Sequence, residues 1–259
     1  ELTGVGLGHS DILPARHQGK PSQMSPTGAA DPPDHKWQGK EPEGKYGEVP
    51  QIDQGSLNVN TTAVMLSIGG NDARFTKVGM SCAAGIDCSA TGYTMEGDDK
   101  PLRDKQNELI DGVVKDSVRE VVRHIRVRAP NARIFVMGYP HLFEPGCQYA
   151  ITLPPGFPVG FSTGETAFLN SLADRMTTVL PSDAANKVHG MDARSEFGGH
   201  GICSNAEYLH GFVVPDLQED EDGDPVQQAS METMHPNQEG NLAYARILNG
   251  YMDLYGYDW

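Results

Sequence analysis

The sequence predicts an α/β fold built on a parallel β-sheet, and three features carry this prediction. Two short apolar runs, at residues 63–68 and 132–137, end in glycine-containing turns, which is typical of buried parallel strands. Between them, residues 102–127 carry apolar side chains at helical spacing. A strand, a long helix and a second strand form a βαβ unit, whose crossover is right-handed in nearly all proteins. We therefore expect a doubly wound α/β sandwich.

Each element of this unit has a recognisable end. The first strand is followed at once by Gly69-Gly70-Asn71-Asp72, where the chain can turn sharply. Along the expected helix, the positions at this spacing are Leu109, Val113, Val114, Ser117, Val118, Val121, Val122 and Ile125, all of them apolar except Ser117. Ala129-Pro130-Asn131 ends this helix, because proline cannot continue it. The second strand stops at Gly138-Tyr139-Pro140.

The same alternation continues toward the C-terminus. Residues 163–180 predict a helix with one apolar face, formed by Phe168, Leu172, Met176 and Val179. Residues 187–191 predict an edge strand. Residues 236–251 predict a last helix, with Pro236 in its opening turn.

Length and composition suit one folded unit. The chain has 259 residues, of which 38% are hydrophobic, enough for a sizeable core. We expect a single domain spanning 1–259, with residues 14–50 as an irregular insert rich in Pro, Gly, Lys and acidic residues. The insert is long for a connection within a compact domain, so it is either a lid over a binding site or a surface loop.

The charge balance excludes several kinds of partner. Lys and Arg number 20 against 35 Asp and Glu, which gives a net charge of −15. Such a surface repels phosphate backbones and anionic headgroups, so we expect no nucleic-acid binding and no basic membrane patch. No apolar run approaches the roughly 18 to 20 residues that span a bilayer, so no transmembrane helix is expected.

The cysteines indicate an oxidising compartment. Cys82, Cys88, Cys147 and Cys203 are even in number and lie in loop-like sequence, which predicts two disulfides, most simply 82–88 and 147–203. Zinc is the alternative for the first pair, but five intervening residues and no nearby His or Cys pair argue against it. Asn60-Thr61-Thr62 is also a glycosylation sequon. An extracellular location is expected.

Two segments are candidates for chemistry. Asn71 follows a strand at the sheet edge where open α/β folds bind ligands, and its side-chain amide could stabilise an oxyanion. It could equally be a turn residue that tolerates positive φ. His235, just before the last helix, could act as a general base, with Glu232 holding the other imidazole nitrogen. A structural histidine before proline is the other interpretation.

Both segments resemble sequence blocks of the SGNH (GDSL-type) hydrolases. Leu66-Ser-Ile-Gly-Gly-Asn-Asp72, followed by Phe75 and Cys82, is similar to the third block of this family. His235-Pro-Asn-Gln-Glu-Gly240, followed by Ala243-Tyr244, is similar to the fifth, which carries the catalytic histidine. Further similarity, to the secreted actinobacterial lipase and esterase branch, lies in residues 48–53, 136–143 and 199–203.

This resemblance implies a flavodoxin-like three-layer α/β/α sandwich with a central parallel sheet. It also implies acyl transfer by a Ser-His-Asp type apparatus, with an oxyanion hole made by the serine amide, a glycine amide and the Asn71 side chain. The acid at the usual position is Glu232 here, and in some relatives a main-chain carbonyl does its work. The implied chemistry needs no cofactor and no metal.

The first block, Gly-Asp-Ser, is where the family pattern breaks. Residues 5–10 could be a degenerate first block, with Ser10 as the nucleophile. Alternatively Gly6, with Asp11-Ile-Leu13 behind it, matches the second block and supplies an oxyanion amide. The second interpretation is favoured, because a nucleophilic serine of this type needs a helix behind it and Ser10 precedes Pro14 and a Gly/Pro-rich tract. The serine and the first strand would then come from an upstream segment or a second chain that completes the sheet.

The sequence therefore predicts a carboxylic ester hydrolase that acts on lipids or small acyl esters. Its site residues are expected to be His235, Glu232, Asn71 and Gly6. The competing hypothesis is a non-catalytic module of hydrolase-like fold that binds a glycan, an acyl group or a partner protein. Residues 216–224 carry six acidic side chains, which favour a solvated loop over a calcium site.

Overall fold

The computed structural model describes residues 6–7, 51–53, 55–83, 87–153, 157–213, 218–219, 225–226 and 232–256. These residues group into two compact units. Unit 1 comprises 1–75, 108–137 and 179–190, and unit 2 comprises 76–107, 138–178 and 191–259. The expected insert 14–50, Ser10 and most of the acidic run 216–224 lie outside the described residues.

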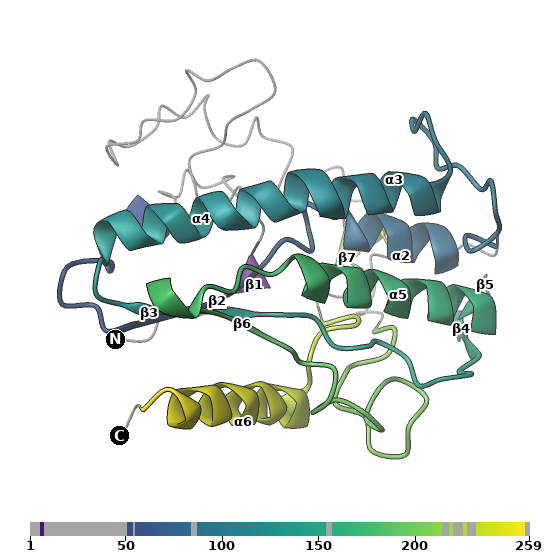
Figure 1. Cartoon of the computed structure of the whole chain (residues 1–259). Helices are drawn as coiled ribbons and strands as arrows, with labels where there is room; N and C mark the ends of the chain where they lie inside the picture. Colours follow the sequence, from purple (N-terminus) through teal and green to yellow (C-terminus); the bar gives the residue numbers. More distant parts are fainter. Residues whose placement is uncertain are drawn as a thin grey trace. The chain divides into compact units, whose positions relative to one another are not determined.

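Unit 1 holds most of a four-stranded sheet. Its strands are β1 (Gly6–Leu7), β2 (Ala63–Ile68), β3 (Arg133–Met137) and β6 (Val188–Met191), in the order β1-β2-β3-β6 (Figure 1). The β1–β2 and β2–β3 pairs are parallel. Backbone bonds from Ile134 to Lys187 and from Gly138 to Met191 advance together along both strands, so β3 and β6 are parallel as well. The predicted parallel α/β class is confirmed.

The long helix, whose residues 102–107 belong to unit 2 and whose remainder belongs to unit 1, contains a break in its hydrogen-bond pattern. It runs from α3 (Leu102–Leu109) through a π-helical turn (Ile110–Val114) into α4 (Lys115–Arg128), which lies along the sheet in Figure 1. Val114, Val118, Val121 and Ile125 are buried, as predicted. Val113, however, is 54% exposed, because the wider π turn rotates it away from the apolar face. Its assignment to that face is therefore wrong.

The last turn of α4 contacts the segments that precede β3 and β6. The Arg126 guanidinium donates to the carbonyl oxygens of Ala132 and Asn186, at 2.6 and 2.5 Å. Both carbonyls lie outside the helix, just before β3 and β6. One side chain thus joins the end of α4 to the loops that lead into β3 and β6.

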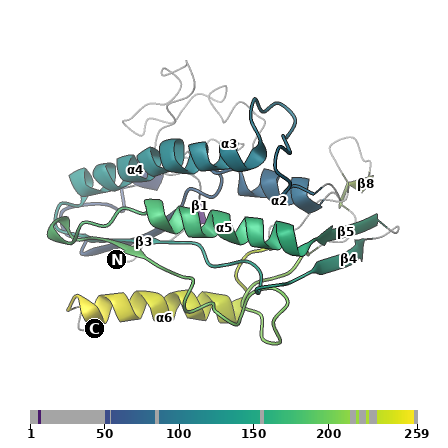
Figure 2. The ribbon, with the colours of Figure 1, turned by 45° about the vertical axis from the view of Figure 1, so that its right-hand side comes forward.

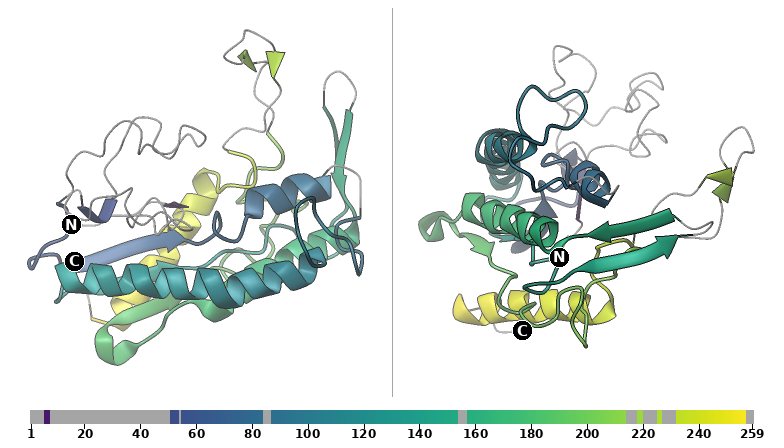
Figure 3. Two further views of the ribbon diagram at one scale, coloured as in Figure 1. Left: turned by 90° about the horizontal axis from the view of Figure 1, so that it is seen from above. Right: turned by 90° about the vertical axis from the view of Figure 1, so that its right-hand side faces the viewer.

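Unit 2 contains elements that the sequence did not predict. Helix α2 (Phe75–Ala83), whose first residue belongs to unit 1, follows the turn after β2. Strands β4 (Tyr149–Leu153) and β5 (Phe157–Phe161) form an antiparallel hairpin (Figures 2 and 3). A second, very short hairpin joins β7 (Gln218–Glu219) to β8 (Pro225–Val226).

Aromatic packing fixes the base of the β4–β5 hairpin. The ring centroids of Phe143 and Phe161 are 5.3 Å apart, and Tyr149 lies 6.3 Å from Phe143 and 6.2 Å from Phe161. Phe143 and Phe161 are buried. The cluster therefore gives this two-stranded element, which alone would be marginal in water, a hydrophobic anchor.

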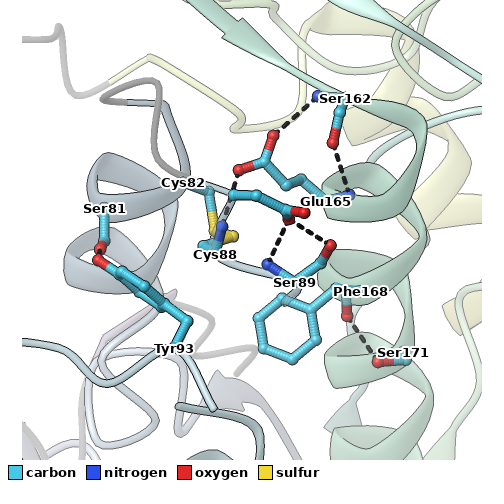
Figure 4. The surroundings of a disulfide bond; sticks show 10 residues. Ser81, Cys82, Cys88, Ser89, Tyr93, Ser162, Glu165, Phe168 and Ser171 are labelled. Carbon is cyan, nitrogen blue, oxygen red and sulfur yellow. Dashed lines mark hydrogen bonds between the residues drawn. A yellow bond between two sulfur atoms is a disulfide. The ribbon is translucent and has the colours of Figure 1, made fainter. Parts of the chain in front are cut away.

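Helix α5 (Thr163–Val179) begins beside both disulfides, which pair as predicted: Cys82–Cys88, which Figure 4 shows, and Cys147–Cys203. Zinc ligation by the first pair is thereby excluded, since both sulfurs are bonded to each other. The predicted apolar residues of α5, from Phe168 to Val179, are buried.

The last helix, α6, spans Gln238–Leu254. Asn237 is its N-cap, and the Asn237 side chain accepts a hydrogen bond from Gly240 N at 3.0 Å. Pro236 thus precedes the cap and is not in the opening turn as predicted, because the cap position falls to the better hydrogen-bond acceptor. Within the described part of the chain, no helix combines the length and apolarity needed to cross a membrane.

Candidate active site

The first predicted site segment is the turn between β2 and α2 in unit 1. Gly69 has φ of 105°, which glycine adopts without strain. Backbone bonds from Ala73 to Gly69 (2.8 Å), from Arg74 to Asn71 (2.8 Å) and from Phe75 to Gly70 (3.0 Å) wind the chain into the helix. Asn71 is exposed on this turn.

This geometry removes one interpretation of Asn71. The positive φ values in the turn belong to Gly69 and Arg74, not to Asn71. A tolerance for left-handed backbone therefore does not explain why an asparagine stands here. Its amide remains a candidate for hydrogen bonding at the carboxyl end of β2, where parallel sheets present ligand-binding residues.

The second segment is the loop that carries His235, in unit 2. His235 Nδ1 lies 3.0 Å from the backbone carbonyl oxygen of Thr233, and His235 N donates to Glu232 O at 3.0 Å. Met234, between them, has φ of 59°, a left-handed conformation that is unfavourable for a side chain of this size. This curl brings the imidazole back over the carbonyl two residues earlier.

The contact assigns the proton on the imidazole. A carbonyl oxygen only accepts, so the neutral ring must carry its hydrogen on Nδ1. Nε2 then keeps its lone pair, which is the arrangement a general base requires. The residue that orients His235 through Nδ1 is thus Thr233, by its main chain.

A neighbouring segment, residues 207–213, holds the loop along its length. His210 N donates to His235 O at 2.9 Å, and Asn237 N donates to Tyr208 O at 2.9 Å. Leu209 and Pro236 form an isolated antiparallel bridge. These contacts resemble one short rung of sheet, and they fix the histidine immediately ahead of α6.

The imidazole lies on a surface cavity of about 680 Å³. Its walls combine polar groups with apolar surface, and they include His210, Glu232, His235, Asn237, Asn241 and Leu242. Leu242 is 47% exposed there. A hollow with an accessible histidine and an apolar wall can accept an ester with a hydrocarbon arm.

Sequence reasoning identified Glu232 and His235 as site residues and missed Thr233 and His210. Glu232 and His235 line the same cavity, but the contact at Nδ1 is to the Thr233 carbonyl. Asn71 and Gly6 belong to unit 1, and their convergence with His235 stays a prediction. Thr233 and His210 were missed. Every residue has a carbonyl, so Thr233 gave no signal, and His210 is far from His235 in sequence.

Tyr244, within the motif that follows His235, packs against another aromatic ring. Its ring centroid lies 5.0 Å from that of Phe197. Burial, together with nearby Tyr139, raises the pKa of the Tyr244 phenol well above its usual range. The phenol therefore stays neutral, and it contributes packing to the start of α6.

Comparisons with known proteins agree on one class. The chain is 29% identical to Lipase 1 of Streptomyces coelicolor over 210 residues, which cover 80% of this chain and 66% of that protein. It is 30% identical to a lipase of Streptomyces rimosus over 164 residues, covering 61% of this chain and 53% of that protein. The chain thus spans between about half and two thirds of these relatives. No family model matches the sequence.

Two solved structures of similar fold come from the same genus. Phospholipase A1 from Streptomyces albidoflavus NA297 matches with a TM-score of 0.56 and 25% identity, covering 77% of this chain and 72% of that one. The extracellular lipase from Streptomyces rimosus matches with a TM-score of 0.59 and 22% identity, covering 95% and 98%. The fold is therefore that of α/β lipases. Taken together, the relatives and the solved structures are named as lipases or as a phospholipase A1.

Proposed function

We propose that the protein hydrolyses carboxylic esters by acyl transfer through a serine, with His235 as the general base. The observation that carries this proposal is the bond between His235 Nδ1 and the Thr233 carbonyl, on the wall of an open cavity. It leaves the imidazole in the tautomer and orientation that proton abstraction needs. The lipases and the phospholipase A1 among the similar proteins support an ester as the substrate.

In the proposed reaction, Nε2 of His235 takes the proton of the serine hydroxyl as its oxygen attacks the ester carbonyl. The side-chain amide of Asn71 and the backbone amide of Gly6 would stabilise the oxyanion, and the protonated imidazole then gives its proton to the leaving alcohol. Water repeats the sequence on the acyl-enzyme, which releases the acid and restores the serine. No step calls for a further cofactor.

We assign the orientation of His235 to the Thr233 carbonyl rather than to the carboxylate of Glu232. The 3.0 Å contact to Nδ1 supports this choice. Glu232 takes part through its own main chain, whose carbonyl accepts from His235 N. The imidazolium that forms during the reaction would then be stabilised by a dipole and not by a full charge.

The nucleophile in this proposal is a serine from a segment upstream of Gly6, as the second-block interpretation predicts. A strand added with that segment would pair at the edge of β1 that faces away from β2, or take the place of β1 beside β2, since β3 lies on the other side of β2. A fluorophosphonate probe, followed by peptide mass spectrometry of the full-length protein, identifies the labelled serine. Label on Ser10 would contradict the upstream assignment.

The substrate class follows from charge and from the cavity. A net charge of −15 disfavours approach to anionic membranes, so neutral or zwitterionic esters are the proposed substrates. The apolar surface of Leu242 and Pro236 suits an acyl chain or an apolar alcohol. Two disulfides support an extracellular site of action.

A p-nitrophenyl ester assay on the full-length protein tests the proposal. We expect turnover that His235→Ala lowers by roughly a thousandfold or more, as the loss of a catalytic base does in related mechanisms. Turnover that survives this substitution would refute the assignment of the base. If wild-type protein is inactive yet binds ester analogues, the protein is the non-catalytic module instead.

A further inference from the structure

We propose that the Thr233 hydroxyl is a positioning group for His235, because it holds in place the carbonyl to which the imidazole is bonded. This inference rests on the proposed function and goes one step beyond it. The catalytic role stays with His235, and Thr233 acts through it.

The hydroxyl makes two bonds to one residue. Thr233 Oγ1 accepts from Val213 N at 3.1 Å and donates to Val213 O at 3.0 Å. The side chain thereby hydrogen-bonds both the N–H and the carbonyl of Val213, as a neighbouring strand would. Two simultaneous bonds leave the side chain no alternative rotamer that keeps both, so the position of the Thr233 backbone is fixed as well.

Val213 is itself anchored. The next residue back, Phe212, donates its N–H to the hydroxyl of Tyr149 at 2.9 Å, and Tyr149 belongs to strand β4. A Cβ on Gly211 would lie only 2.6 Å from the Tyr149 hydroxyl. The two segments are therefore so close that any side chain at position 211 would clash with Tyr149. The two hydrogen bonds that hold the Thr233 side chain are thus connected, through Val213, Phe212 and Tyr149, to the aromatic cluster of the β4–β5 hairpin.

The loop that carries His235 needs these hydrogen bonds because its backbone conformation is unfavourable. Met234 has φ of 59°, and a side-chain-bearing residue stays there only when surrounding contacts over-determine it. Met234 N donates to His210 O at 3.1 Å on one side, and the Thr233 hydroxyl acts on the other. Without the hydroxyl, the Thr233 peptide can rotate and withdraw its carbonyl from Nδ1.

Withdrawal of the carbonyl has a specific chemical consequence. The bond made by one imidazole nitrogen decides which nitrogen carries the proton. With no acceptor at Nδ1, the proton moves toward Nε2 and removes the lone pair that accepts the serine proton. The imidazole remains in place, but a smaller fraction of it is competent as a base.

The test compares three variants of the full-length protein. Thr233→Val keeps the shape and removes the hydroxyl, Thr233→Ser keeps the hydroxyl, and Thr178→Val is the matched control on α5, where the hydroxyl only bonds its own helix at Arg175 O. We expect Thr233→Val to lower kcat by about 10- to 100-fold with KM within about twofold, as the loss of orienting partners does elsewhere. Thr233→Ser and Thr178→Val should stay within about threefold of wild type.

The ¹⁵N NMR signals of His235 give the decisive readout. Wild type and Thr233→Ser should show protonated Nδ1, whereas Thr233→Val should shift toward protonated Nε2. Unchanged kcat and tautomer in Thr233→Val would overturn the proposal, and so would lost activity in both Thr233 variants with the tautomer unchanged. The NMR result does not depend on turnover, so it stands apart from the test of ester hydrolysis by His235→Ala.

Discussion

Gly240 shows how closely the last helix approaches the loop that holds the candidate base. A Cβ at this position would overlap the carbonyl oxygen of Tyr208 and lie 3.0 Å from the Pro236 ring. The Tyr208 carbonyl already accepts the N–H of Asn237, the cap of α6. A glycine is required in the first turn because two backbones meet there.

Gly240→Ala is therefore expected to destabilise the protein. Pushing the start of α6 away from Tyr208 should cost about 1–3 kcal/mol of unfolding free energy, typical of overpacking, and should lower kcat by displacing His235. Urea denaturation measures the first effect. Gly250→Ala, in the same helix but with nothing within 4 Å of the added carbon, should instead stabilise by about 0.5–1 kcal/mol. Equal effects of the two substitutions would contradict this account.

Glu232→Gln separates the two candidate orienting groups. Because the Thr233 carbonyl accepts from Nδ1, the variant should keep kcat within about threefold of wild type, against a loss of roughly a thousandfold or more in His235→Ala. Steady-state kinetics on a soluble ester is sufficient. A large loss in Glu232→Gln would show that the carboxylate does the orienting.

At the scale of elements, the start of α5 joins distant parts of unit 2. Ser162 and Glu165 form a reciprocal capping box: Ser162 N donates to Glu165 Oε2 at 2.8 Å, and Glu165 N donates to Ser162 Oγ at 3.3 Å. Glu165 Oε1 also accepts from Cys88 N at 3.0 Å (Figure 4). Thr166 Oγ1 donates to Cys147 O at 2.9 Å, so one helical turn contacts both disulfide loops.

Glu165→Gln should show how much these contacts at the start of α5 contribute to the free energy of unfolding. The carboxylate is 5% exposed and accepts two backbone N–H groups, and an amide can satisfy only one of them through its single oxygen. We expect a loss of about 1–3 kcal/mol in thermal or urea unfolding. Glu239→Gln, at an exposed position in the first turn of α6, is the control and should change stability by less than about 0.5 kcal/mol.

The elements divide clearly into those that the sequence predicted and those that it did not. Apolar runs and helical spacing located β2, β3, α4 and α5, because burial imposes those patterns directly. The β4–β5 hairpin was not predicted, because its Pro- and Gly-rich sequence is typical of a loop. The π turn was not predicted, because no residue pattern indicates it. The site followed the same division: Asn71 and His235 stand in side-chain motifs, whereas the Thr233 contact to His235 is made by backbone.

At the scale of the whole molecule, a charged cluster should govern stability in acid. Arg194 bonds Asp192 at 2.6 Å and Asp174 at 2.6 Å, and His141 bonds Asp174 at 2.8 Å. Hydrogen bonding by Arg194 lowers the pKa of Asp192 despite partial burial. Burial opposes the shift at Asp174 more strongly, yet the bonds from His141 and Arg194 still lower the pKa of that carboxyl.

A carboxyl whose pKa is lower in the folded state stabilises the fold above its unfolded value, near 3.9, and loses that contribution as the pH falls through the folded value. Unfolding free energy should therefore decline as the pH drops below about 4. Arg194→Gln should flatten this decline while lowering stability at neutral pH. Urea titrations at a series of pH values between 5 and 2 measure the slope, and an unchanged slope in the variant would assign acid sensitivity to other groups.

The backbone contact at Nδ1 of His235 also bears on how the orientation of this histidine responds to acid. A peptide oxygen neither gains nor loses a proton in mild acid, so the acceptor at Nδ1 is not lost by protonation. On the proposed mechanism, the orientation of the general base should therefore persist, as the pH falls, for as long as the fold itself does.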